Sequence, residues 1–340
     1  MRNWRTSFIH RHKRGLTVAA LALGVAAAAL LSLCLGAEEV SARQVLLALF
    51  GGEDGTAAAR IVRYVRLPRT CAALLSGGAL AAAGVIIQGV LANSLAAPST
   101  VGVNSGAGFA VAICCALFPT ALNLVPFAAL AGAFGGALLV LLIAERTGAS
   151  KITLVLAGIA ISNIFSAGVD AVVTFVPEAL NGYSDFRIGG FSGISMSQLF
   201  PACWLILGGL AVAISLHNEL DVLLLGQEQA QSLGLPAKRL RLIFLILTAM
   251  LAGSAVSFSG LLGFVGLVVP HMMRRIVGGE SGLLLTASAL GGAAMLCTCD
   301  LLARILFAPY ELPVGIVMSL VGGPFFICLL MRQRGGRLSD

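Results

Sequence analysis

Long apolar tracts dominate this sequence and constrain its fold more than any other feature. Nine are visible, at residues 16–36, 71–92, 101–118, 122–144, 152–176, 199–216, 242–270, 283–302 and 312–331. Most are close to the ~20 residues that a helix needs to cross a bilayer. Only 11% of the 340 residues are charged, against about 25% in soluble domains. Because lipid offers backbone groups no partners, we expect an all-α membrane protein.

The first tract, 16–36, follows a basic N-terminal stretch and imitates a secretory signal peptide. Its 21 apolar or small residues are too many for a signal-peptide core, and no good cleavage site follows. We therefore expect a retained first span, preceded by a basic cytoplasmic tail at 1–15.

The seventh tract, 242–270, is 29 residues long and has basic residues at both ends, within 238–241 and at 274–275. Basic clusters prefer the cytoplasm, but one crossing would separate them and two would need ~40 residues. A full helix that returns as a shorter half-helix satisfies both conditions, with the reversal near Gly260 and Gly263. The sequence thus predicts about ten membrane helices, with the N and C termini cytoplasmic.

This topology distributes the basic residues unequally. Fifteen of the 22 Lys and Arg residues fall on the cytoplasmic side, in agreement with the positive-inside rule. The seven external exceptions are Arg43, Arg60, Arg63, Arg66, Arg69, Arg187 and Arg304. Four of them recur at three-residue spacing in ARIVRYVRLPRT, residues 59–70, where Pro68 is expected to break the row so that it forms no continuous helical face. We expect Arg60 and Arg63 to bind lipid headgroups or to steer a partner.

Motifs for catalysis and metal binding are missing from the sequence. There is no phosphate-binding G-x-x-x-x-G-K-[ST], no H-E-x-x-H and no nucleophile elbow. The eight cysteines lie in apolar tracts without a C-x-x-C pair, so we expect small buried hydrophobes. We expect no catalytic residues, no metal site and no cofactor in this chain. If ATP drives its activity, another chain must bind ATP and Mg²⁺.

Four stretches together carry a family resemblance. They are RLPRTCAALLSGGALAAAGVIIQGVLANSLAAPSTVGVNSGAG at 66–108, LLLGQEQAQSLGL at 223–235, GFVGLVVPHMMRRIVG at 263–278 and DLLARILFAPYELPVGIVMSLVGGPFF at 300–326. In this order they resemble the FecCD-type permeases of binding-protein-dependent ABC importers, which carry ferric siderophores, haem and cobalamin. The resemblance extends from about residue 16 to residue 333.

The resemblance implies the type II ABC importer permease fold, with residues 1–340 as a single transmembrane domain. It implies a second permease subunit, in a homodimer or heterodimer, and two cytoplasmic ABC ATPase subunits. It also implies an external or periplasmic substrate-binding protein and a place in the bacterial cytoplasmic (inner) membrane. The family's short eighth helix corresponds to the half-helix expected from the charges.

The loop at 217–238 is cytoplasmic by span parity and contains helix-forming residues between two glycines. The resemblance implies that it is the coupling segment that sits on the ATPase. An ordinary amphipathic loop helix is the alternative. The candidate coupling residues are Gly226, Glu228, Ala230, Leu233 and Gly234.

NSLAAP, residues 93–98, resembles the family's N-P-L-A-x-P turn, which narrows the cytoplasmic exit of the pathway. Asn93 and Leu95 match that motif and are the candidate gate residues, while Ser94 and Ala97 depart from it. A simple helix-ending turn explains the same residues.

For the external side, the resemblance implies that Arg66, Arg69 and Arg304 dock the binding protein through bidentate pairs with its carboxylates. Asp300 and Arg304 have the i, i+4 spacing of an intrahelical ion pair. Arg304 can both pair with Asp300 and dock the binding protein if Asp300 orients the Arg304 guanidinium group.

A polar row follows one face of the fifth span, at Asn163, Ser166, Asp170 and Thr174. In lipid such a row should turn inward, so we expect it to line the pathway, with hydrogen bonding between helices as the alternative. The region 177–198 is too polar to span and resembles the family's short outer helix. The few pathway charges suit a large chelate carried whole.

The expected function is therefore a permease subunit that imports an iron chelate by alternating access. A ferric siderophore is expected first and haem next, with cobalamin as an alternative cargo. A stand-alone secondary transporter or channel is an alternative of a different class, but it should contain an intramembrane relay, for which Asp170 is the candidate. A membrane-embedded enzyme would need a catalytic constellation, and the sequence contains none of the motifs for one.

Overall fold

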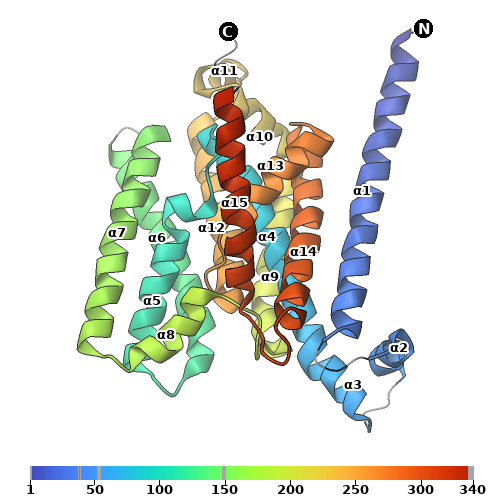
Figure 1. Cartoon of the computed structure of the whole chain (residues 1–340). Helices are drawn as coiled ribbons and strands as arrows, with labels where there is room; N and C mark the ends of the chain where they lie inside the picture. The colour runs from blue at the N-terminus through green and yellow to red at the C-terminus, as the bar shows by residue number, and fades with distance from the viewer. Residues whose placement is uncertain (1, 37, 39, 52–54, 148–150, 336–340) are drawn as a thin grey trace.

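The chain forms a helical bundle in a computed structural model (Figure 1). The structure describes residues 2–335 except 37, 39, 52–54 and 148–150. Side chains at 2–14, 151, 227–228, 330 and 332–335 also lie outside the described part. All regular elements among the described residues are helical.

Among the described residues, the longer helices lie on the apolar tracts of the sequence. They are α1 (Arg2–Cys34), α4 (Leu67–Leu91), α5 (Val103–Leu117), α6 (Val125–Arg146), α7 (Lys151–Phe175), α9 (Met196–Ser215), α12 (Ala237–Ser259), α13 (Val265–Val277), α14 (Ser281–Ile305) and α15 (Val314–Gly335). Within the described residues, seven helical segments are long and apolar enough to cross a membrane, and Val103–Leu117 and Val314–Leu329 are shorter apolar helices. The chain is therefore a multi-span, all-α membrane protein.

Short helices connect the longer ones. They are α2 (Ala42–Phe50), α3 (Ala57–Ile61), the π-helical η1 (Val62–Arg66), η2 (Pro98–Val101), η3 (Leu122–Leu124), α8 (Ala179–Ile188), α10 (His217–Leu224) and α11 (Gln227–Ser232). In Figure 1, α2, α3 and α8 lie at one end of the bundle and α11 at the other, where α15 ends.

The seventh apolar tract reverses where its glycines predicted. Helix α12 ends at Ser259, Gly260 has φ +68° and Phe264 has φ +65°, and α13 begins at Val265. A Cβ on Gly260 would lie 2.4 Å from the Phe186 carbonyl oxygen, so this position requires glycine both sterically and conformationally.

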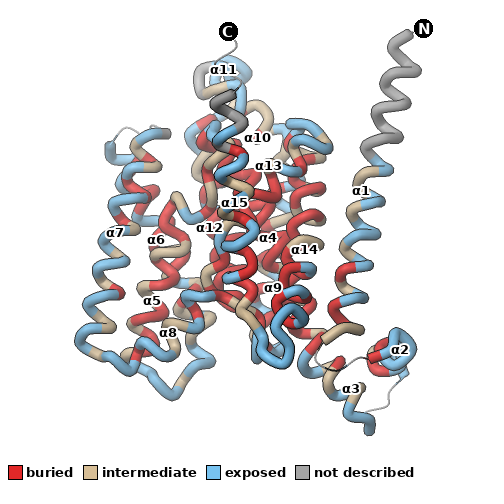
Figure 2. The backbone as a smooth tube through the Cα atoms, viewed as in Figure 1, coloured by how far each residue is buried: buried red, intermediate tan, exposed pale blue. Residues whose placement is uncertain are grey.

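Helix α4 is at the centre of the bundle, and small residues let its neighbours approach closely. A Cβ on Gly84 would lie 1.9 Å from the carbonyl oxygen of Gly266 in α13, and one on Gly77 would lie 2.2 Å from that of Gly292 in α14. Such contacts bring helix backbones together where lipid gives no hydrophobic driving force. Figure 2 shows the resulting core, with α4 buried along most of its length.

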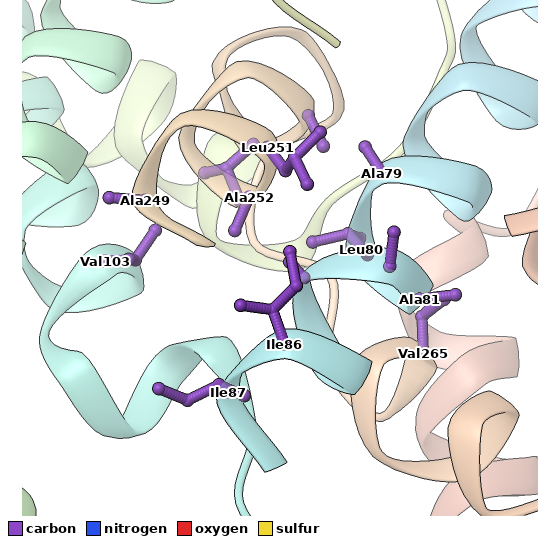
Figure 3. Close-up of a cluster of buried hydrophobic side chains, with 14 of the residues drawn as sticks. Ala79, Leu80, Ala81, Ile86, Ile87, Val103, Ala249, Leu251, Ala252 and Val265 are labelled. Carbon is purple, nitrogen blue, oxygen red and sulfur yellow. The ribbon is translucent and has the colours of Figure 1, made fainter. Parts of the chain in front are cut away.

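Larger aliphatic side chains fill the space between these close contacts. Figure 3 shows Ile86 and Ile87 of α4 among Val103 of α5, Leu251 of α12 and Val265 of α13. All five are at most 2% exposed, so helices that are distant in sequence share one apolar core.

The arginine row forms no continuous face, as predicted, although Pro68 does not interrupt the helix that carries it. Residues Ala57–Leu91 run as one helical segment, with Pro68 in the first turn of α4 and a π-helical turn at η1 just before it. A π turn is wider than an α turn and alters the helical register. Arg60 is consequently exposed, whereas Arg66 and Arg69 are buried.

Candidate functional site

Two arginines of the predicted docking set bind the C-terminal end of α1. Arg66 donates from Nη1 to the carbonyl oxygens of Leu33 (2.9 Å) and Cys34 (2.8 Å) and from Nη2 to that of Glu38. Arg304 donates from Nη2 to the carbonyl oxygen of Ser32 (3.1 Å) and to its hydroxyl (2.7 Å). The last carbonyls of a helix lack intrahelical donors and carry partial negative charge, so these guanidinium groups cap α1.

Asp300 of α14 joins the arginines into one ionic cluster. Its carboxylate is fully buried and accepts from Arg69 Nε at 3.1 and 3.0 Å. Arg304 Nε lies 3.4 Å from Asp300 Oδ2, at the i, i+4 spacing from which this pair was expected. Arg69 also reaches Glu311, whose side chain is 44% exposed, through Nη1 at 2.6 Å. The cluster ties α4 to α14 and to the loop after it.

The docking role of Arg66, Arg69 and Arg304 remains a prediction, and all three side chains are buried in the single chain. They are 4%, 6% and 5% exposed, and each already binds groups of this chain. The sequence could not show this, because their partners come from α1 and α14. Arg60 is exposed, and Arg63 donates to the Ala48 carbonyl oxygen.

A cavity of about 400 Å³ opens beside this cluster. Arg69, Glu311 and Asp185 contribute its charged groups, and the chain at 188–192, which follows α8, contributes another wall. Helix α8 lies within the region 177–198 that was expected to contain a short external helix. The cavity therefore combines both charge signs at the end of the bundle that holds α2 and α3.

The polar row of α7 lies on an open surface. Asn163, Ser166, Asp170 and Thr174 are all exposed, and Thr174 Oγ1 donates to the Asp170 carbonyl oxygen of its own helix at 2.7 Å. Contact between helices through hydroxyl groups is made instead by Ser162, whose Oγ lies 3.0 Å from that of Ser105 in α5. Sequence reasoning missed Ser162, although the residue adjoins the row. Figure 2 shows how much of α7 is exposed.

The predicted inner gate forms a tight turn at the end of α4. Ala92 has φ +46°, and Asn93 Oδ1 accepts from the Leu95 backbone N–H at 3.0 Å. A cavity of about 300 Å³ separates Leu91 and Asn93 from the apolar residues Ile152, Val155 and Leu156 of α7. The turn is present, as both a cytoplasmic gate and a simple helix-ending turn would require. It lies across the cavity from the first turns of α7.

Gln88 and Arg274 form a polar link that the sequence interpretation overlooked. Arg274 Nη2 donates to Gln88 Oε1 at 3.1 Å, and Gln88 Nε2 donates to the Gly266 carbonyl oxygen at 3.4 Å. Gln88 is 2% exposed. A lone glutamine within an apolar tract could have signalled this link between α4 and α13.

The predicted coupling segment forms α10 and α11. Gly226 and Gly234 flank α11 with φ +115° and +80°, which only glycine adopts without strain. Ala230 is fully buried and packs inside the chain, whereas Leu233 is 63% exposed and can contact a partner. The side chain of Glu228 lies outside the described residues. Asp221 Oδ1 in α10 accepts from the Ser281 backbone N–H at 3.0 Å, which joins this segment to the first residue of α14.

The described residues contain no group of three or more His, Cys, Asp or Glu side chains arranged to hold a metal ion. All eight cysteines are free thiols.

Comparisons with known proteins support the motif interpretation. Residues 24–332 match the model of the FecCD transport family. The hemin transport system permease protein HmuU of Yersinia pestis is 40% identical over 280 residues, covering 80% of this chain and 84% of HmuU. The iron(3+)-hydroxamate import system permease protein FhuB of Bacillus subtilis (strain 168) is 38% identical over 314 residues, covering 91% of this chain and 81% of FhuB.

A solved structure described as an inward-facing conformation of a metal-chelate type ABC transporter has the same fold. It matches with a TM-score of 0.83 at 29% identity, over 93% of this chain and 98% of the other. The resemblance carried by the four motifs is confirmed, and the chain belongs to the FecCD transport family.

Proposed function

We propose that this chain is the transmembrane permease subunit of an ATP-driven ABC importer that carries an iron chelate across the bacterial cytoplasmic membrane. It works by alternating access between an external and a cytoplasmic opening. In this proposal the chain has ten membrane helices, with α13 as the returning half-helix, and both termini lie in the cytoplasm. The end with α11 is then cytoplasmic and the end with α2, α3 and α8 external.

The cargo proposal rests on the relatives. Their names describe import of iron(3+)-hydroxamate by FhuB and of hemin by HmuU. A ferric siderophore is the first candidate for this chain and haem the next, with cobalamin as the alternative within the family. All three cargoes are large and are carried whole. A pathway with few charges suits such cargo, and the polar row of α7 has one acidic residue, Asp170, among its four polar residues.

The exposed polar face of α7 is the observation that carries the proposal. Helix α7 is long and apolar enough to span the membrane, yet its row Asn163, Ser166, Asp170 and Thr174 is exposed in the single chain. Polar groups in contact with lipid chains are costly. A second permease subunit facing this row would cover it and enclose a polar pathway between the two copies, leading to the turn at Asn93.

The remaining partners fit the two ends of the bundle. We propose that α11, with exposed Leu233, contacts a cytoplasmic ATPase subunit and transmits its movement to α14 through Asp221. ATP and Mg²⁺ bind to that ATPase. At the external end, docking by Arg66, Arg69 and Arg304 requires a carboxylate of the binding protein to replace an internal partner. Glu311, whose side chain is 44% exposed, is one such partner of Arg69.

ATP-dependent uptake in proteoliposomes tests the proposal. The chain is reconstituted with its cognate ATPase and binding protein, and ferric hydroxamate, haem and cobalamin are supplied separately. We expect uptake to require ATP and the binding protein. We expect Asn163→Leu to lower the uptake rate while ATPase binding is retained. Thr298→Val, at an exposed polar position of α14, is the matched control and should transport normally.

Uptake without ATP or without the ATPase would refute the importer proposal and favour a stand-alone transporter. Equal rates for Asn163→Leu and Thr298→Val would refute the pathway assigned to α7.

A further inference from the structure

A cavity of about 340 Å³ lies where α6 ends and where α7 and α12 begin, apart from the sites described above. Helix α6 contributes Leu141, Ala144 and Glu145, α7 contributes Leu154, and α12 contributes Lys238, Arg241, Leu242 and Leu245. All three helices are long and apolar enough to span the membrane, so this cavity is formed by membrane helices at one face of the bilayer.

The lining separates into an apolar part and a charged part. Leu141, Leu154 and Leu245 are buried and form an apolar wall. Lys238 and Arg241 lie in the first two turns of α12 and Glu145 in the last turn of α6, at the level where helices leave the hydrocarbon. Apolar surface beneath charged groups at this depth matches a lipid, whose headgroup lies above its acyl chains.

The charge of the lining selects the kind of headgroup. Among the described lining residues, Lys238 and Arg241 are cationic and Glu145 is anionic, so basic groups outnumber acidic ones and favour an anionic phosphodiester. Basic pockets between membrane helices at the cytoplasmic face are suited to acidic lipids. Glu145 can accept hydrogen bonds from headgroup hydroxyls but repels a second anionic group.

We propose that this cavity binds an acidic phospholipid with a hydroxylated headgroup, such as phosphatidylglycerol. Lys238 and Arg241 hold the phosphate, Glu145 accepts from the headgroup hydroxyls, and an acyl chain lies along Leu141, Leu154 and Leu245. The site needs only that α6, α7 and α12 span the membrane; its assignment to the inner leaflet rests on the proposed function and topology.

The lipid cavity is separate from the proposed gate. The gate cavity uses Ile152, Val155 and Leu156 of α7, whereas the lipid cavity uses Leu154. Leu154 is about 200° around the helix from Ile152 and Leu156 and about 100° from Val155, so the two cavities contact different faces of α7. The lipid would therefore contact the side of α7 away from the gate, and also the start of α12, the helix that directly follows the coupling segment.

Lipid binding to the full chain tests the proposal. Purified protein in detergent is titrated with phosphatidylglycerol or with phosphatidylcholine of the same acyl chains, and native mass spectrometry gives the bound fractions. We expect phosphatidylglycerol to bind more tightly. Lys238→Gln and Arg241→Gln should each weaken its binding about fivefold, the equivalent of ~1 kcal/mol per basic side chain.

Arg239→Gln is the matched control, because Arg239 is exposed in the same turn of α12 but does not line the cavity. It should leave lipid affinity unchanged. Leu242→Trp fills the groove without altering charge and should also weaken binding. Lys238 is exposed, so Lys238→Gln carries the test if Arg241→Gln does not fold.

Three results would overturn the proposal. Equal affinity for phosphatidylglycerol and phosphatidylcholine would show that the cavity does not select an acidic headgroup. Equal weakening by Arg239→Gln would show attraction by the general positive charge instead of a site. Binding of glycerol 3-phosphate as tight as that of the lipid would identify a site for a free anion. None of these measurements depends on transport, so a failure here is distinguishable from a failure of the importer proposal.

Discussion

The two carboxylates that bind Arg69 differ in burial, and this difference gives the sharpest stability prediction. Asp300 is fully buried and holds Arg69 Nε through both carboxylate oxygens, whereas the Glu311 side chain is 44% exposed and contacts Arg69 Nη1. Asp300→Asn keeps the shape of the side chain but removes its charge. Arg69 and Arg304, both at least 94% buried, then lack their shared counter-ion.

The expected magnitudes follow from this burial. Removing one partner of a buried ion pair costs about 3–5 kcal/mol, because the remaining charge stays desolvated. An exposed pair contributes about 0–1 kcal/mol, because water screens it. Asp300→Asn should therefore lower the free energy of unfolding several-fold more than Glu311→Gln does, although both changes remove one negative charge from the same arginine.

Equilibrium unfolding in mixed micelles, followed by circular dichroism, measures the two variants side by side. The double variant Asp300→Asn/Arg69→Gln should lose less than the sum of the two single variants, because it removes one uncompensated charge together with its partner. A cost for Asp300→Asn no larger than that for Glu311→Gln would refute the reasoning, as would strictly additive costs in the double variant.

Three further predictions concern the packing and the coupling segment. Gly84→Val should destabilise the fold by at least the ~1–3 kcal/mol of an overpacked core, since its Cβ would meet a backbone oxygen of α13, whereas Gly135→Val, with nothing within 4 Å, should be tolerated in the same unfolding assay. Asp221→Ala should cost ~0.5–1.5 kcal/mol through loss of its hydrogen bond to the start of α14 and should weaken the link between ATP hydrolysis and uptake, as the ratio of the two rates would show. Gly234→Asp adds strain and a charge beside α11 and should uncouple ATP hydrolysis from uptake. Gly193→Asp carries similar strain at φ +72° away from that segment and should remain coupled; equal coupling in these two variants would contradict the proposed ATPase contact.

The sequence alone determined the helical membrane fold. Tracts of about 20 apolar residues leave the backbone only one way to satisfy its polar groups in lipid, so the positions of the helices follow from local composition. The fold-back after α12 was also predictable, because basic residues at both ends of a 29-residue tract excluded a single crossing and Gly260 permits the reversal. The family likewise follows from the four motifs.

Only the tertiary structure decided what the polar residues contact. Arg66 and Arg69 are buried, because the carbonyls that Arg66 binds belong to α1 and the carboxylate that Arg69 binds belongs to α14. The π-helical turn before Pro68 and the link between Gln88 and Arg274 also depend on neighbouring helices. Insertion of a helix into lipid depends on local composition, which can be read from the sequence. The partner of a buried charge depends on which helices come into contact, and this is decided only when the bundle packs.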